Sequence, residues 1–196
     1  VYGQVGSILD ECNEKINLVV FPEGFEYLED PINDGWAITR EIAEALYVPV
    51  IIGASTAEGT EEAYYFNPNV KENDPSGDTQ MKVYIKHSTS SRVYFDYEFD
   101  QETADLVYKP LILNGQRIQI CICHDMFYPL LMERLDREGM DILINLTGGN
   151  VKMSKWATLL RGRSIEMDGS VICTMGNRTS MKQQSDRIIY DKGDQL

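Results

Sequence analysis

The feature that most constrains the fold of this chain is the repeated alternation of short apolar runs with stretches of helical periodicity. Continuous apolar runs such as INLVVF and VPVIIGA are typical of strands that are buried on both faces of a sheet. Elsewhere the apolar residues recur at helical spacing, as Val5, Ile8 and Leu9 do, which indicates an amphipathic helix. Strands that alternate with helices predict an α/β fold.

The expected strands lie at residues 16–21, 48–54, 62–68, 81–87, 117–123, 141–146, 170–176 and 186–191. The expected helices lie at residues 5–12, 35–46, 127–137 and 155–168. The polar segment 69–80 carries turn signals and connects two of the strands.

Composition and charge narrow the class of protein. The chain has 196 residues, 43% of them hydrophobic and 25% charged, which fits one ordinary globular domain. A net charge of −13 repels phosphate backbones and argues against nucleic-acid binding. No apolar run approaches the length of a membrane-spanning helix, so no membrane association is expected. The 4 cysteines are scattered in apolar contexts, which indicates reduced thiols and a cytoplasmic protein.

The stretch QICICHDMFYP gathers Cys121, Cys123, His124 and Asp125 and admits several kinds of site. A metal site is disfavoured because adjacent residues on a strand point to opposite faces and cannot all converge on one ion. A redox pair is disfavoured because the spacing is C-x-C rather than C-x-x-C. A nucleophile is possible, because Cys123 would lie on a strand-to-helix turn where free backbone N–H groups can stabilise an oxyanion. Core packing is the alternative for each cysteine.

Other residues could assist such a thiol. Glu23 follows an apolar strand between a proline and a glycine, where a partly desolvated carboxylate could serve as a base. Lys86 lies at the end of another strand, where its ammonium could stabilise negative charge. His87 is another possible base, whereas His124 is adjacent to Cys123 and adjacent side chains seldom face each other. Taken alone, Glu23 and Lys86 are more simply explained as solvated side chains.

Together these motifs resemble those of the nitrilase superfamily of carbon–nitrogen hydrolases. FPE at Glu23, Y-x-K-H at Lys86 and I-C-x-D-x-x-Y-P around Cys123 occur in the order that this family has. Downstream, DILINLTGG and the W-x-x-x-x-R-x-R pattern that begins at Trp156 are similar to the same family. The resemblance covers nearly the whole chain.

The resemblance implies an α-β-β-α sandwich of four layers and hydrolysis of a small amide, carbamoyl compound or nitrile. It implies that Glu23 is the general base and that Cys123 forms a thioester acyl-enzyme. Lys86 and the backbone N–H of His124 are then expected to stabilise the oxyanion. The family needs no metal or organic cofactor, and a homodimer or higher homo-oligomer is expected. An N-acyltransferase and a catalytically inert binding module are the alternatives on this fold.

The chain also departs from the family pattern. Leu130 stands where a glutamate is common, and His124 stands where tyrosine or tryptophan is common. The family has a second active-site glutamate, for which Glu98 and Glu102 are both candidates. The first strand and the C-terminal region of the family look short or absent, and the chain begins without methionine. We therefore expect a single domain over residues 1–196 that is incomplete at both ends.

The remaining marked residues carry simpler expectations. Asp125 is expected to cap the following helix, and Cys121 and Cys173 to pack in the core. Tyr128 could line the substrate pocket or pack in the core, and Thr147 could contact substrate from a strand end.

Three further groups carry expectations, the first as a possible substrate contact and the other two as structural features. Asn145 is considered together with Thr147 as a possible substrate contact at a strand end. Arg161 and Glu166 are expected to form ion pairs. Glu58, Glu61 and Glu62 are expected to form a solvated acidic loop.

Overall fold

Two five-stranded sheets form the framework of the protein. The computed structural model describes residue 7 and residues 15–71, 74–88, 101–148, 152–176 and 186–190. The first sheet contains β1 (Val19–Val20), β2 (Glu26–Leu28), β3 (Val50–Thr56), β4 (Glu61–Phe66) and β5 (Met81–Ile85). The second sheet contains β6 (Leu111–Leu113), β7 (Gln116–Ile122), β8 (Ile142–Gly148), β9 (Ser170–Gly176) and β10 (Asp186–Tyr190).

Both sheets mix parallel and antiparallel pairing. In the first sheet β1 and β2 run parallel to β3, while β3, β4 and β5 are antiparallel neighbours. In the second sheet β7, β8 and β9 are parallel, and β6 and β10 are antiparallel to their neighbours. Because β7 and β8 are parallel, their carboxyl ends meet at one edge of the sheet, where α/β proteins commonly form their sites.

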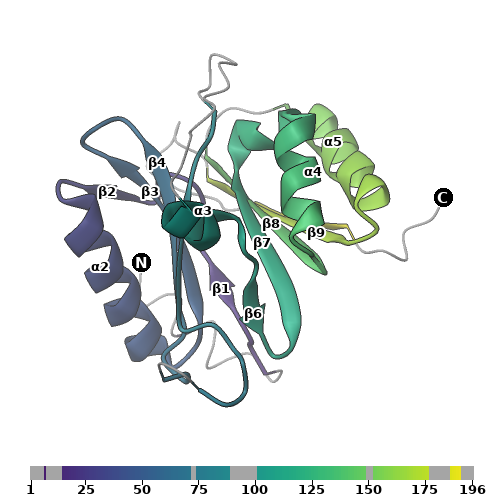
Figure 1. Cartoon of the computed structure of the whole chain (residues 1–196). Helices are drawn as coiled ribbons and strands as arrows, with labels where there is room; N and C mark the ends of the chain where they lie inside the picture. Colours follow the sequence, from purple (N-terminus) through teal and green to yellow (C-terminus); the bar gives the residue numbers. More distant parts are fainter. Residues whose placement is uncertain are drawn as a thin grey trace.

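Helices cover the outer faces of both sheets (Figure 1). Helix α2 (Pro31–Leu46) packs on the first sheet, and helices α4 (Pro129–Arg137) and α5 (Met153–Glu166) cover the second. The short helix α3 (Gln101–Tyr108) lies beside β5. The order of layers is helix, sheet, sheet, helix, which confirms the expected α-β-β-α sandwich.

The core follows from the alternation of side chains along β3. Val50 and Ile52 belong to an apolar cluster with Ile42 of α2, whereas Ile51 belongs to the cluster shared with the second sheet. Strand β7 is buried at every residue from Ile118 to Ile122. That burial fits a strand that lies between the other sheet on one face and helices on the other.

Each expected strand is present, although several boundaries differ. Helix α2 begins earlier than its apolar periodicity predicts, because Asp30 caps it by accepting the Asn33 N–H and Pro31 fits its first turn. The expected helix at 127–137 is divided into a 3₁₀ turn η1 (Cys123–Phe127) and helix α4. The helix expected at 5–12 lies outside the described residues except for residue 7.

The short elements β2, β6 and α3 are not predicted by the sequence. A strand of three residues, such as β2 or β6, is too short to show a period of alternation. None of the helices that the structure describes is long and apolar enough to cross a membrane.

Candidate active site

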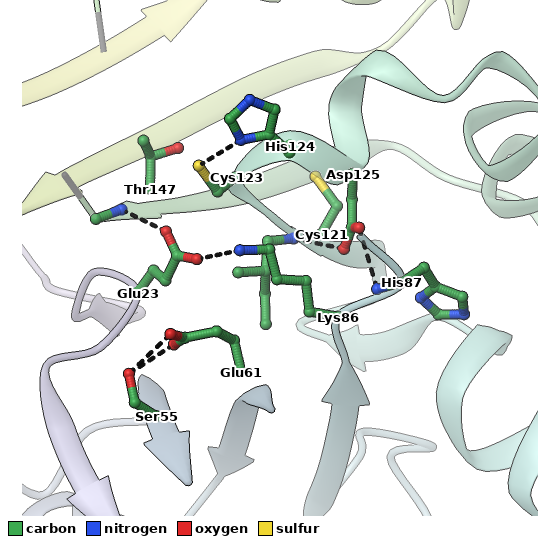
Figure 2. A network of polar contacts seen from close by, with 12 residues as sticks. Glu23, Ser55, Glu61, Lys86, His87, Cys121, Cys123, His124, Asp125 and Thr147 are labelled. Atoms are coloured by element: carbon green, nitrogen blue, oxygen red, sulfur yellow. Dashed lines mark hydrogen bonds and ion pairs between the residues drawn. The ribbon is translucent and has the colours of Figure 1, made fainter. Parts of the chain in front are cut away.

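Three side chains from three strand ends meet between the two sheets (Figure 2). Glu23 follows β1 and Lys86 follows β5 of the first sheet, while Cys123 follows β7 of the second. The Lys86 ammonium and the Glu23 carboxylate form an ion pair in which the side chains are only 8% and 5% exposed. The fold therefore brings together the residues that the sequence marked as cation, base and nucleophile.

The backbone around Glu23 lies unusually close to both sheets. Gly24 has a φ of 61°, so the chain turns sharply directly after the carboxylate. A Cβ atom at Gly53 of β3 would lie 2.5 Å from the carbonyl oxygen of Pro22, and one at Gly148 of β8 would collide with the Glu23 carbonyl. Gly148 also donates its backbone N–H to Oε2 of Glu23 at 2.8 Å. Glycine at 53 and 148 is thus what lets Glu23 occupy this position.

Lys86 is a fixed ammonium in the site. Burial alone would lower the pKa of its amine, but the charge and hydrogen bond of Glu23 outweigh burial, and the pKa is raised. The backbone N–H of Lys86 donates to the carbonyl oxygen of Glu61 at 2.9 Å. This bond extends the pairing of β4 and β5 by one residue and fixes the place where the lysine leaves the sheet.

Cys123 opens the turn η1 in a strained conformation. Its φ of 48° lies in the left-handed region, which is uncommon for residues with a side chain and recurs at functional sites. Burial raises the pKa of its thiol and the Glu23 carboxylate raises it further, while Lys86 and the His124 backbone N–H lower it. The thiol is therefore protonated at neutral pH, and it needs a base within reach to act as a nucleophile.

His124 lies nearer to the thiol than the sequence suggests. Its Nδ1 is 3.7 Å from Sγ of Cys123, although adjacent side chains are expected to point apart. The left-handed backbone at Cys123 and the tight turn that follows bring the two side chains to the same side (Figure 2). The ring also packs against Phe127, with 5.4 Å between the ring centroids.

Asp125 does not cap helix α4, which corrects the expectation from the sequence. Residue Tyr128 precedes α4 and makes no side-chain capping bond. The Asp125 carboxylate instead accepts the backbone N–H of Ile122 at 3.3 Å, which closes the turn η1 from within. The carboxylate turns back toward the first sheet because Tyr84 of β5 and His87, which follows β5, also donate to it.

The other predicted substrate contacts are placed as follows. Tyr128 is half-buried and packs against the main apolar core. Thr147 is fully buried, and its hydroxyl donates to Oδ1 of Asn145 at 2.5 Å. Glu98 lies outside the described residues, and Glu102 lies in α3 with its side chain outside them.

The other two described cysteines are core residues, as the sequence predicts. Cys121 and Cys173 are fully buried, and burial raises the pKa of both thiols. Nδ2 of Asn145 lies 3.3 Å from Sγ of Cys121, and the Trp156 indole N–H donates to Cys173. Within the described part of the chain, no group of three or more His, Cys, Asp or Glu side chains is arranged to hold a metal ion.

The acidic cluster expected in a loop is partly a strand. Glu61 and Glu62 belong to β4, and only Glu58 lies in the preceding turn. Ser55 donates its hydroxyl to the Glu61 carboxylate at 2.8 Å, beneath Glu23 and Lys86 in Figure 2. The cluster looked like a loop because the strand begins with two polar residues before its apolar part.

Arg163 of α5 holds the cysteine turn from the helix layer. Its Nε and Nη2 both donate to the carbonyl oxygen of Met126, at 2.9 and 2.8 Å. Its guanidinium also forms an ion pair with Glu166, one of the two residues that were expected to form ion pairs. The W-x-x-x-x-R-x-R pattern marks both arginines equally, so only the packing of the helix distinguishes them.

The family profile and the solved structures that this chain resembles point to the same protein family. The sequence profile of the carbon-nitrogen hydrolase family matches residues 5–192. The carbon-nitrogen hydrolase from Helicobacter pylori G27 has a similar structure, with a TM-score of 0.67 and 19% identity over 97% of this chain and 76% of that one. An amidase from Nesterenkonia sp. gives a TM-score of 0.68 at 14% identity over 99% and 77% of the two chains.

A carbon–nitrogen hydrolase superfamily protein from Xanthomonas campestris gives a TM-score of 0.67 at 17% identity, over 97% of this chain and 76% of that one. A search of curated protein sequences found no match. At these identities the structural likeness establishes the fold.

Proposed function

Since this chain belongs to the carbon–nitrogen hydrolase family, we propose that it hydrolyses a small amide, carbamoyl compound or nitrile through a thioester on Cys123. The observation that carries the proposal is the buried Glu23–Lys86 ion pair beside a protonated thiol on a strained turn. A base, a cation and a nucleophile are the groups that acyl transfer to a thiol requires.

In the first half of the reaction, the Glu23 carboxylate accepts the thiol proton while Sγ of Cys123 attacks the substrate carbon. For an amide, a carbon–sulfur bond forms and the carbonyl π electrons move to oxygen. Glu23 then returns the proton to the nitrogen as the carbon–nitrogen bond breaks, and ammonia or an amine leaves. Glu23 is suited to both steps because it already exerts the largest charge effect on the thiol.

The developing negative charge is stabilised by fixed positive groups. Lys86 is held as an ammonium by its ion pair and remains charged throughout. The backbone N–H of His124 already acts on the sulfur of Cys123, and it is proposed as the second oxyanion donor. Removing one such donor typically costs about 10²–10³-fold in kcat.

In the second half, water loses a proton to Glu23 and attacks the thioester carbon. The carbon–sulfur bond breaks, a carboxylic acid is released, and the thiolate of Cys123 regains a proton from Glu23. In the Nesterenkonia amidase, a glutamate-to-glutamine mutant carries the acetamide moiety of fluoroacetamide on its active-site cysteine. That adduct keeps the amide group and is therefore an alkylated cysteine rather than a thioester; it supports a nucleophilic role for Cys123.

The remaining predicted residues are proposed as contacts to substrate rather than as reacting groups. His124 is the best placed of them, because its ring lies directly beside the thiol. Tyr128, which is half-buried, is proposed to line the substrate pocket, and the fully buried Thr147 is proposed to shape it through its bond to Asn145. Glu98 or Glu102 is proposed as the second glutamate.

The direct test is release of ammonia from a panel of small amides, carbamoyl compounds and nitriles, with and without an added amine. For an amide or a nitrile, hydrolysis predicts ammonia and free acid in equal amounts, and a Cys123→Ala variant that releases neither. An N-acyl product that forms only with the added amine would favour the acyltransferase instead. No product from any compound would count for an inert binding module.

A second test needs no substrate. Iodoacetamide is expected to label Cys123 before Cys121 and Cys173, which are fully buried. Cys121 and Cys123 lie in one tryptic peptide, residues 118–134, so fragmentation must assign the adduct. Equal and slow labelling of all the cysteines would contradict an activated thiol at this position.

A further inference from the structure

The two halves of the candidate active site belong to different sheets. Lys86 follows a strand of the first sheet and Cys123 follows a strand of the second. Backbone hydrogen bonds within each sheet do not set the distance between the sheets. Some other contact must keep the ammonium at a constant distance from the nucleophile.

The carboxylate of Asp125 lies between these halves and is fully buried. Its Oδ1 accepts the backbone N–H of His87 at 3.1 Å, and its Oδ2 accepts the Tyr84 hydroxyl at 2.8 Å. The same Oδ2 accepts the backbone N–H of Ile122 at 3.3 Å. Figure 2 shows the bond between the Asp125 carboxylate and the backbone N–H of His87.

The donors flank the reacting residues along the chain. His87 directly follows Lys86, and Tyr84 lies two residues before Lys86 in β5. Ile122 directly precedes Cys123. One carboxylate therefore ties the backbone next to the ammonium to the backbone next to the thiol.

We propose that Asp125 is a positioning residue that holds Lys86 at a fixed distance from the Cys123 turn, an inference that rests on the proposed function of this site. A role as a turn cap would require only the bond to Ile122. The bonds to Tyr84 and His87 come from the opposite sheet and contribute nothing to the turn itself, so capping alone does not account for them.

Burying this carboxylate is unfavourable unless its bonds are made. Burial raises its pKa to about 6, although the hydrogen bond from Tyr84 acts in the opposite direction. An apolar side chain at this position would avoid burying a charge. It would also leave the backbone N–H groups of His87 and Ile122 without this acceptor. The buried carboxylate is therefore favourable only while all of its hydrogen bonds are made.

The test compares three variants of the whole chain. Asp125→Asn keeps the size of the side chain but presents an amide donor to groups that are themselves donors. Tyr84→Phe keeps the carboxylate and removes one bond. Asp141→Asn is the matched control, because Asp141 also accepts a backbone N–H, that of Arg117 at 2.8 Å, at a site remote from Cys123.

Amide turnover gives the first readout. A 1 Å misplacement of a reacting group can cost about 10²-fold, so Asp125→Asn should lower kcat on the order of 100-fold with little change in KM. Tyr84→Phe should lower kcat by roughly tenfold, because the other bonds to the carboxylate persist. Asp141→Asn should leave both constants near those of the wild-type protein.

The rate of iodoacetamide labelling of Cys123 at pH 8 gives a second readout that needs no substrate. Loss of a nearby negative charge would by itself lower the thiol pKa and speed labelling. Displacement of Lys86, which lowers the thiol pKa, would slow labelling instead. The proposal predicts slower labelling of Cys123 in both variants. Tyr84→Phe keeps the negative charge of Asp125, so slower labelling in that variant reports the displacement of Lys86 alone.

The inference is overturned if the two variants label Cys123 as fast as the wild-type protein does, or faster. It is also overturned if they lose no more kcat than Asp141→Asn. Should Asp125→Asn fail to fold, as judged by circular dichroism, Tyr84→Phe decides the question. If the wild-type protein hydrolyses no compound in the panel, the proposed function fails, and the labelling rates still test the position of Lys86.

Discussion

Replacing Gly53 with alanine tests whether the close approach of β3 to Glu23 sets the geometry of the site. A Cβ atom at this position would lie 2.5 Å from the carbonyl oxygen of Pro22 and 2.7 Å from Cα of Glu23. Ordinary contact begins at 3.4 Å, so the oxygen contact alone is short by 3.4 − 2.5 = 0.9 Å. Both neighbours are backbone atoms, so the chain itself must move.

A shift of this size is large for a catalytic base. Misplacement by about 1 Å can cost about 10²-fold in rate, which corresponds to about 2.7 kcal/mol in the activation free energy. The strain of overpacking is expected to cost about 1–3 kcal/mol of stability as well. We therefore expect Gly53→Ala to fold with a lower melting temperature and to release ammonia about 100-fold more slowly at saturating substrate.

Gly162→Ala is the matched control for this prediction. Gly162 lies in α5, and a Cβ atom there would meet nothing within 4 Å. Alanine in a helix interior is favoured over glycine by about 0.5–1 kcal/mol, so this variant should melt slightly higher and keep full activity. The reasoning is refuted if Gly53→Ala keeps kcat within about threefold of wild type, a change far smaller than a 1 Å displacement implies.

Three further predictions follow from the buried charges. Glu23→Gln should lower kcat by about 10²–10⁴-fold while the protein stays folded, measured as ammonia release alongside a thermal melt; turnover near that of wild type would exclude Glu23 as the base. Lys86→Met should destabilise the protein at neutral pH by about 3–5 kcal/mol, because it leaves the Glu23 carboxylate buried without its cation. The double variant Glu23→Gln/Lys86→Met should recover much of this loss, measured by urea unfolding. Additive losses in the two single variants would contradict the ion pair. Because burial raises the pKa of Asp125 from 3.8 to about 6, the folded state binds its proton more tightly than the unfolded state, so this group lowers stability as the pH rises from about 4 to 6. Comparing the unfolding free energies of wild type and Asp125→Asn across that window should show a flatter pH dependence in the variant, and an unchanged slope would contradict the shift.

The parts of the site that the sequence predicts are those carried by local pattern. Lys86 and Cys123 directly follow a strand and Glu23 lies three residues after one, and strand ends in an α/β fold converge at an edge of a sheet. Their order and flanking residues supply the resemblance to the family. The layers of the fold follow from the same alternation of strands and helices, because each apolar face must be covered.

The parts that the sequence misses depend on contacts between distant residues. The bonds of Asp125 to His87 and Tyr84 span 38 and 41 residues, and nothing in the local pattern around Asp125 indicates them. The approach of His124 to the thiol follows from a single backbone torsion at Cys123, which no side-chain pattern encodes. Similarly, only the register of β3 and β4 reveals that Glu61 faces Ser55.

The most direct test of the central claim is the identity of the acylated residue during turnover. The protein is mixed with the amide from which it releases most ammonia, quenched in acid within one turnover, and digested for peptide mass spectrometry. The account predicts that the acyl group lies on Cys123 within peptide 118–134, and that Cys123→Ala shows neither adduct nor turnover. An acyl group on another residue, or turnover that persists in Cys123→Ala, would contradict it.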